Sequence, residues 1–122
     1  MLRHPLFASL VIALTLALGG CASEVGNDGA KVGGSCDVSG ECTNDSVCRT
    51  GEDWPNGYCA QSCDTNEDCA DGSLCSELAG GVCIVECGAA ADCRSSEDDG
   101  GYTCSELDVR GAAGTFTGCV AE

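Results

Sequence analysis

Thiol groups dominate the chemistry that this sequence could perform. The chain has 122 residues and 13 cysteines, and twelve of these cysteines lie between Cys36 and Cys119. Zinc sites usually need Cys-x2-Cys pairs, often with histidine. Here the shortest spacer has three residues, and the only histidine is His4. The spacing therefore favours structural disulfides, and we expect no metal and no cofactor beyond weak calcium binding, which is considered below.

The twelve cysteines divide into three groups of four. Three-residue spacers at 60–62 and 84–86 separate cysteine-rich modules over 36–59, 63–83 and 87–119. An acid precedes the second cysteine of each module, a serine or tyrosine lies two residues before the third, and a glycine lies one or two residues before the fourth. In chain order these residues are Glu41, Asp68 and Asp92, then Ser46, Ser73 and Tyr102, then Gly57, Gly81 and Gly118. The matching neighbours indicate an internal repeat.

Modules of this size rarely fold without disulfides or metals. Four cysteines permit three pairings. We favour bonds from the first to the third and from the second to the fourth cysteine, because interleaved bonds tie both halves of a module together, although the other pairings stay open. The favoured bonds are Cys36–Cys48, Cys42–Cys59, Cys63–Cys75, Cys69–Cys83, Cys87–Cys104 and Cys93–Cys119.

The elements that position these cysteines should be few and short. From residue 22 onward, Leu, Ile, Val and Phe make up 13 of 101 residues, too few for an ordinary core, and no helical period is present. Alternating polarity over 106–109 and 115–118, around a turn at 111–114, predicts a hairpin. Leu78 and Val82 around Gly80 and Gly81 predict a second one. The expected fold class is small and disulfide-rich, with short β-hairpins and mostly irregular loops.

The N-terminus has the pattern of a targeting segment. Arg3 and His4 form a basic start, and residues 6–18 are an uncharged apolar stretch of 13 residues. A transmembrane helix needs about 20 apolar residues, so this stretch is short for spanning a membrane. We expect a helical signal peptide over 1–20.

Leu18-Gly19-Gly20-Cys21 resembles a bacterial lipobox. The resemblance implies cleavage between Gly20 and Cys21, a diacylglycerol on the Cys21 sulfur, and a fatty acid such as palmitate on the new N-terminus. Twelve cysteines then remain for pairing, and Ala22 permits export to the outer membrane. The lipid bilayer is the implied partner, with residues 21–35 as a lipidated flexible tether. The alternative is an ordinary secretory signal that leaves Cys21 as a thiol.

The cysteine repeats resemble the modules of myxobacterial and related delta-proteobacterial lipoproteins, and more distantly EGF-like and Dickkopf-type modules. The likeness covers 36–119 and concerns spacing, so it implies no functional residue. The expected function is a non-catalytic cell-envelope lipoprotein, on the periplasmic or cell-surface face of the outer membrane, whose modules serve interaction, adhesion or envelope structure. Its protein or glycan partner is unknown.

Charge and composition exclude several other functions. A net charge of −15 argues against binding to nucleic acid or anionic lipid. After cleavage the chain has no histidine for a catalytic triad, so we expect no enzyme.

Three further features are candidates for binding. Stapled loops with Arg49 or Arg94 could make a protease inhibitor. Residues 64–68 and 97–101 are acidic clusters that could bind calcium weakly, although Cys69 and Cys75 occupy the glycine and glutamate positions of an EF-hand. Trp54 is expected to pack over a disulfide rather than to anchor a ligand, and the loops 94–103 and 105–118 are candidates for recognition.

Overall fold

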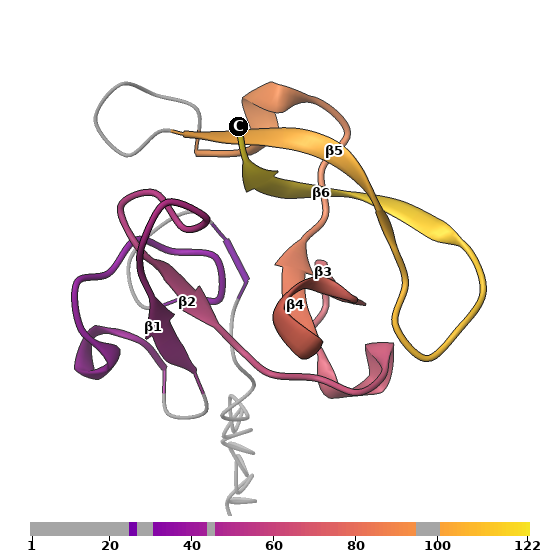
Figure 1. The fold of residues 1–122 in the computed structure, drawn as a ribbon, viewed down its shortest axis with the longest axis horizontal. Helices are drawn as coiled ribbons and strands as arrows, with labels where there is room; N and C mark the ends of the chain where they lie inside the picture. Colours follow the sequence, from indigo (N-terminus) through magenta and orange to yellow (C-terminus); the bar gives the residue numbers. More distant parts are fainter. Residues whose placement is uncertain (1–24, 27–30, 44–45, 95–100) are drawn as a thin grey trace, which may run out of the picture.

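The structure is a computed structural model that describes residues 25–26, 31–43, 46–94 and 101–122. Its described strands form three two-stranded sheets, which follow one another along the chain (Figure 1). Each cysteine-rich module contains one antiparallel hairpin: β1 (Val47–Arg49) with β2 (Tyr58–Ala60), β3 (Ser73–Ser76) with β4 (Val82–Val85), and β5 (Tyr102–Asp108) with β6 (Thr115–Ala121). The described residues also form four single-turn 3-10 helices: η1 (Ser39–Glu41), η2 (Asn66–Asp68), η3 (Leu78–Gly80) and η4 (Ala90–Asp92). The predicted fold class is confirmed. Within the described ranges, no helix is long and apolar enough to cross a bilayer.

The six disulfides link each hairpin to the loop before it. The third and fourth cysteines of a module face each other across the strands, as Cys48 faces Cys59. They do not bond to each other, because each reaches back to the first or second cysteine. The bonds are Cys36–Cys48, Cys42–Cys59, Cys63–Cys75, Cys69–Cys83, Cys87–Cys104 and Cys93–Cys119, which is the pairing favoured from the sequence.

The acid before the second cysteine of each module caps a 3-10 turn. Asp68 shows the arrangement: its Oδ2 accepts hydrogen bonds from the backbone N–H groups of Asp64 at 2.9 Å and Thr65 at 3.2 Å. Glu41 and Asp92 make the equivalent pairs of bonds in the other two modules. These N–H groups begin a turn and have no partner within it, so a carboxylate at this position satisfies two donors at once. The repeat of the acid therefore has a local structural cause.

The position two residues before the fourth cysteine lies against the first cysteine of the same module. Gly57 and Gly81 have φ values of 75° and 116°, and a Cβ atom at either would collide with the carbonyl oxygen of Cys36 or Cys63. The third module has Thr117 at this position, and its hydroxyl donates to the carbonyl of Cys87. Gly118, aligned with the two glycines from the sequence, has a different neighbour, since a Cβ there would lie 2.6 Å from Ile84 Cγ2.

One core is shared among the three modules. Tyr58 and Ala60 of the first, Val82, Ile84 and Val85 of the second, and Tyr102 and Phe116 of the third belong to one buried cluster. Single β-bridges also join the second module to the third, between Ser76 and Val109 and between Glu86 and Gly118. The apolar residues are few, but those of three modules are pooled in one main buried cluster rather than divided among three.

The prediction of a flexible tether is wrong for residues 31–35. Val32 is fully buried beside the disulfide sulfurs of the second module. Backbone hydrogen bonds join Gly33 N to Cys59 O and Cys59 N to Gly34 O, each at 2.9 Å. Val25 forms a further bridge to Val32. The glycines that suggested flexibility instead allow close approach, because a Cβ at Gly33 would collide with Val85. The signal peptide, the lipobox and Cys21 lie outside the described residues.

The hairpin predictions need two corrections. Residues 105–118 are not a recognition loop, since most of them belong to β5 and β6, and the predicted hairpin there is longer than expected. Leu78 does not start a strand. It lies in the turn η3, where Ala79 adopts a φ of 49°, and Ser73–Ser76 is the strand that pairs with β4. The hairpin β1–β2 was not predicted. Most of the loop 94–103 lies outside the described residues.

Candidate functional site: a groove between the modules

An open apolar groove lies where the three modules meet. Its volume is about 430 Å³, which is within the range of small ligand sites. The first module contributes Asp53 and Trp54, the second Leu78 and Ala79, and the third Leu107, Val120 and Ala121. No single module forms this groove, so its shape depends on how the modules pack together.

Trp54 forms one wall and is held by a tight turn. Its backbone N–H donates to Gly51 O at 3.0 Å, and its carbonyl accepts from Gly57 N at 2.9 Å. The indole ring lies 5.1 Å from the ring of Tyr58, and the Arg49 guanidinium lies 5.8 Å from the indole centroid. The structure thus places an aromatic ring against Trp54, in a buried cluster that also contains Cys87, Cys93 and Cys119. The indole is only half-buried, so part of it remains available to the groove.

The opposite wall comes from the β5–β6 hairpin. Leu107 faces Phe116 across the strands, and Val120 lies four residues beyond Phe116. Since side chains two or four residues apart on a strand share one face, Leu107 and Val120 point to the same side. Phe116 is buried on that side, whereas the other two are half-buried. These two strand residues give the groove a rigid apolar side, because the strands that carry them are paired over seven residues.

A buried arginine fixes the third module against the first. Arg94 is 6% exposed, and its Nε and Nη2 donate to the carbonyls of Gly33 at 3.0 Å and Gly57 at 2.6 Å. Its guanidinium lies 4.4 Å from the centroid of Tyr102. Arg94 therefore cannot enter a protease as the sequence analysis suggested. Arg49, the other inhibitor candidate, is half-buried and stacks on Trp54.

Two buried tyrosines complete the centre of the molecule. The Tyr58 hydroxyl donates to Cys83 O at 2.9 Å, and the rings of Tyr58 and Tyr102 are 6.1 Å apart. Burial raises the pKa of both phenols above the usual value of 10.0, and the Arg94 cation partly offsets this rise in the pKa of Tyr102. Both phenols are neutral at physiological pH and serve as hydrogen-bonding core residues.

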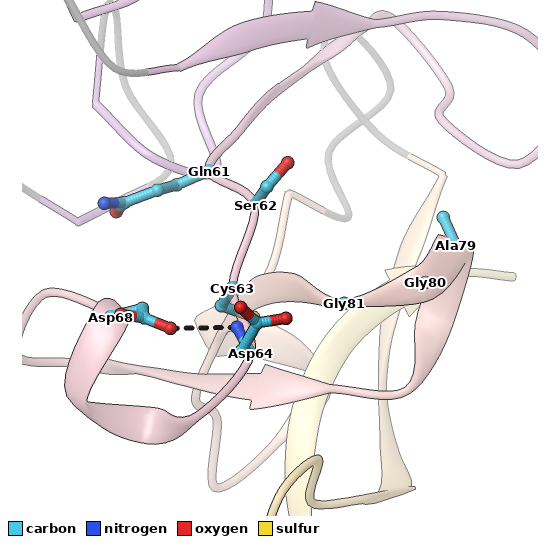
Figure 2. A pocket seen from close by; sticks show the side chains of 8 residues that line it. All are labelled: Gln61, Ser62, Cys63, Asp64, Asp68, Ala79, Gly80 and Gly81. Atoms are coloured by element: carbon cyan, nitrogen blue, oxygen red, sulfur yellow. Dashed lines mark hydrogen bonds between the residues drawn. The ribbon is translucent and has the colours of Figure 1, made fainter.

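A second hollow, of about 440 Å³, is polar and lies within and beside the second module (Figure 2). Its walls include Gln61, Asp64, Asp68 and Gly80. Figure 2 shows the Asp68 carboxylate directed at the backbone N–H of Asp64. The hydrogen bonds that the backbone N–H groups of Asp64 and Thr65 donate to this carboxylate lower the pKa of Asp68, and the bond from Asp64 has the larger effect.

Asn66 Oδ1 is also engaged, because it accepts from Cys75 N at 2.9 Å. Two of the oxygens proposed from the sequence for calcium are therefore used by the chain itself. The other acidic cluster, 97–101, lies almost wholly outside the described residues.

Three groups of cysteine sulfurs lie close enough to resemble metal centres. In each group the three Sγ atoms lie within 4.8 Å of one another, and the groups are Cys36, Cys42 and Cys59, then Cys63, Cys69 and Cys75, then Cys87, Cys93 and Cys119. Every one of these sulfurs belongs to a disulfide. A disulfide sulfur is not a thiolate, so the groups cannot bind metal while the bonds are intact.

The sequence drew attention to Trp54, which was expected to pack over a disulfide rather than to bind a ligand, and it did not indicate the rest of the groove. Leu78 and Leu107 were assigned to hairpins only, and Val120 was not assigned to any element. The available signal was their scarcity: in a chain with so few large apolar residues, each one left partly exposed is informative. Comparison of the chain with protein-family models, with curated proteins and with solved structures found no significant match.

Proposed function

We propose that this chain is an exported, lipid-anchored cell-envelope protein that binds a partner and has no catalytic role. The groove is the observation that supports partner binding. Residues of all three disulfide-bonded modules line it, and the buried cluster that the modules share holds them in place. Among the described residues that line the groove, one side chain is ionisable, Asp53, and the others are apolar. Such a site suits recognition, because acid–base or nucleophilic chemistry needs a nucleophile or a second titratable group beside the first.

The anchoring part rests on the lipobox resemblance at Leu18–Cys21 and on the twelve paired cysteines. Six disulfides are typical of proteins that fold in an oxidising compartment outside the cytoplasm. They leave Cys21 as the one cysteine for another use. Several acyl chains at Cys21 would give stable membrane attachment.

The docked segment limits how far the body can stand from the bilayer. Val25 and residues 31–35 contact the folded modules, so three residues, 22–24, separate Cys21 from the first docked residue, Val25. The distance from Cys21 to Val25 is four residue steps, and a fully extended chain covers at most about 14 Å in four steps. The body would therefore lie close to the membrane surface, which places its partner within or near the same envelope layer.

Mass spectrometry of the membrane-extracted protein tests the anchor. We expect a mature N-terminus at Cys21 that carries a diacylglycerol and a fatty acid, and we expect Cys21→Ser to abolish both the lipid and the cleavage before residue 21. Ala22→Ser is the matched control and should leave the lipid in place. A mature N-terminus without lipid at Cys21 would refute the anchoring proposal.

A further inference from the structure

We propose that the groove binds a basic segment of a partner polypeptide by accepting one bulky apolar side chain of that segment. This inference rests on the proposed binding function and names the chemistry of the partner. It does not depend on the lipid anchor, because the groove is formed by the folded modules alone.

The lining accounts for the apolar side chain. Trp54, Leu78, Leu107 and Val120 converge from three modules on a space of about 430 Å³. Leu78 is 37% exposed on the turn η3, one of three large hydrophobic side chains exposed to this degree among the described residues. A bulky side chain in the groove would cover apolar surface of these four side chains. Burial of apolar surface is the main favourable contribution to the binding free energy in such contacts.

The charges around the groove account for the basic flanks. Asp53 lies in the wall, and two exposed acids are next in sequence to lining residues: Glu77 beside Leu78, and Glu122 beside Ala121. Two arginines lie nearby and are already engaged, Arg49 with Trp54 and Arg110 with Glu77 at 3.1 Å. The rim is thus net negative on a protein of net charge −15, which favours a cationic partner.

The same features disfavour other occupants. A second copy of this chain would bring another charge of −15 to the interface, and like charges suppress association. A glycan needs several convergent polar side chains, whereas Asp53 is the only charged side chain among the lining residues that the structure describes. An anionic lipid headgroup would face the acidic rim.

The groove is also largely preformed. Trp54 is fixed by its turn, Leu107 and Val120 by a paired hairpin, and the modules by Arg94 and the shared core. A preformed site loses little conformational entropy on binding, so a short segment can bind measurably.

The test uses the fluorescence of Trp54, the only tryptophan in the chain and a wall of the groove. The full oxidised chain with Cys21→Ser is titrated with a blocked pentapeptide that has a central leucine and two lysines on each side. We expect a saturable change in emission with a dissociation constant below about 1 mM. We also expect several-fold weaker binding when NaCl is raised from about 50 mM to about 500 mM, since salt screens the rim.

Matched variants separate the groove from the general surface. Leu78→Ser should weaken binding of the leucine peptide about tenfold, because an apolar contact is lost. Val38→Ser, which alters a 61% exposed valine next to η1, should leave binding of the leucine peptide unchanged. Asp53→Asn should weaken binding, whereas Glu67→Gln, on the exposed side of η2, should have a smaller effect.

Three results would overturn the proposal. One is equal binding of a pentapeptide with serine in place of the central leucine, which would show charge attraction alone. Another is equal loss in Leu78→Ser and Val38→Ser, which would place binding elsewhere. The third is tighter binding of a peptide with glutamates in place of the lysines. None of these results bears on the lipid at Cys21, so failure here and failure of the anchor are distinguishable.

Discussion

Replacing Arg94 tests whether one buried cation holds the modules together. Its guanidinium makes two hydrogen bonds to main-chain carbonyls and stacks on Tyr102. Among the described residues it has no carboxylate partner, and its Nη1 has no hydrogen-bond partner. The side chain therefore holds residues 33, 57 and 102 through two main-chain carbonyls and one aromatic ring.

The magnitude follows from these contacts. Two hydrogen bonds from a charged donor contribute about 1.5 kcal/mol each, and a desolvated cation–π contact about 1 to 2 kcal/mol. Removing the charge also relieves the cost of burying it. We expect Arg94→Met, which keeps an apolar stem of similar length, to lower the free energy of unfolding by about 3 kcal/mol. Arg94→Lys should recover less than half of this, because an ammonium group lacks the planar fork of the guanidinium.

Urea unfolding with the disulfides intact, followed by Trp54 fluorescence, measures the effect. Arg110→Met is the matched control: Arg110 is 32% exposed in its ion pair with Glu77, and we expect it to contribute less than about 1 kcal/mol. A loss in Arg94→Met no larger than the loss in Arg110→Met would refute the reasoning. A gain in stability would show that the cost of burying the cation exceeds the value of its contacts.

The pH at which Tyr102 ionises, measured by ultraviolet absorbance, distinguishes the loss of the Arg94 charge from a loosening of the core. Arg94 lowers the pKa of Tyr102, against the larger effect of burial, which raises it. In Arg94→Met the Tyr102 phenol should therefore ionise at a still higher pH if the fold is kept. If the substitution instead opens the core, burial is lost and the ionisation of Tyr102 should move down toward 10.0, the value of an exposed tyrosine.

Three further predictions concern the docked segment and the repeated positions. Val32→Ala should cost about 2 kcal/mol in urea unfolding because Val32 is fully buried, whereas Val47→Ala, at an exposed strand position, should cost much less. Gly57→Ala should prevent quantitative formation of the native disulfides, as measured by peptide mapping, because its Cβ would collide with the carbonyl of Cys36. Gly51→Ala is the control and should give the native disulfide map, since Gly51 also has a positive φ but a Cβ there would meet no neighbouring atom. Asp68→Ala should lower the melting temperature at pH 7 and make little difference at pH 2, because the Asp68 pKa is lowered in the fold and its stabilisation is lost as pH falls through that pKa. An equal effect at both pH values would contradict this capping role.

The cysteine spacing indicated three modules with two bonds each, and compactness favoured the pairing that the structure shows, although the spacing alone left the other pairings open. The hairpin at 102–121 was predictable in part, since its alternation of polar and apolar residues is visible without any tertiary contact. The acid before each second cysteine was visible as a repeat, but its cause was not. The carboxylate accepts two hydrogen bonds from backbone N–H groups, and the sequence pattern does not reveal where those N–H groups lie.

Tertiary packing explains the main errors. Residues 31–35 are rich in glycine, and composition alone cannot distinguish a flexible segment from one whose glycines permit close packing. Arg94 was read as an exposed inhibitor residue because arginine is rarely buried, and its partners, Gly33 and Gly57, lie 61 and 37 residues away. The groove depends on three modules at once, so no local pattern could have indicated it.

The departures of the third module from the repeat show how the modules are joined. Where the first two modules have a buried serine, the third has Tyr102, whose ring reaches Tyr58 of the first module and packs on Arg94. Gly118, which the sequence aligned with Gly57 and Gly81, does not occupy their position in the structure, and its missing side chain lets Ile84 of β4 approach β6. Matching positions thus build each module, through caps and disulfides, whereas these two non-matching positions build contacts between modules. Since the groove exists only between modules, its shape depends on the residues that break the repeat.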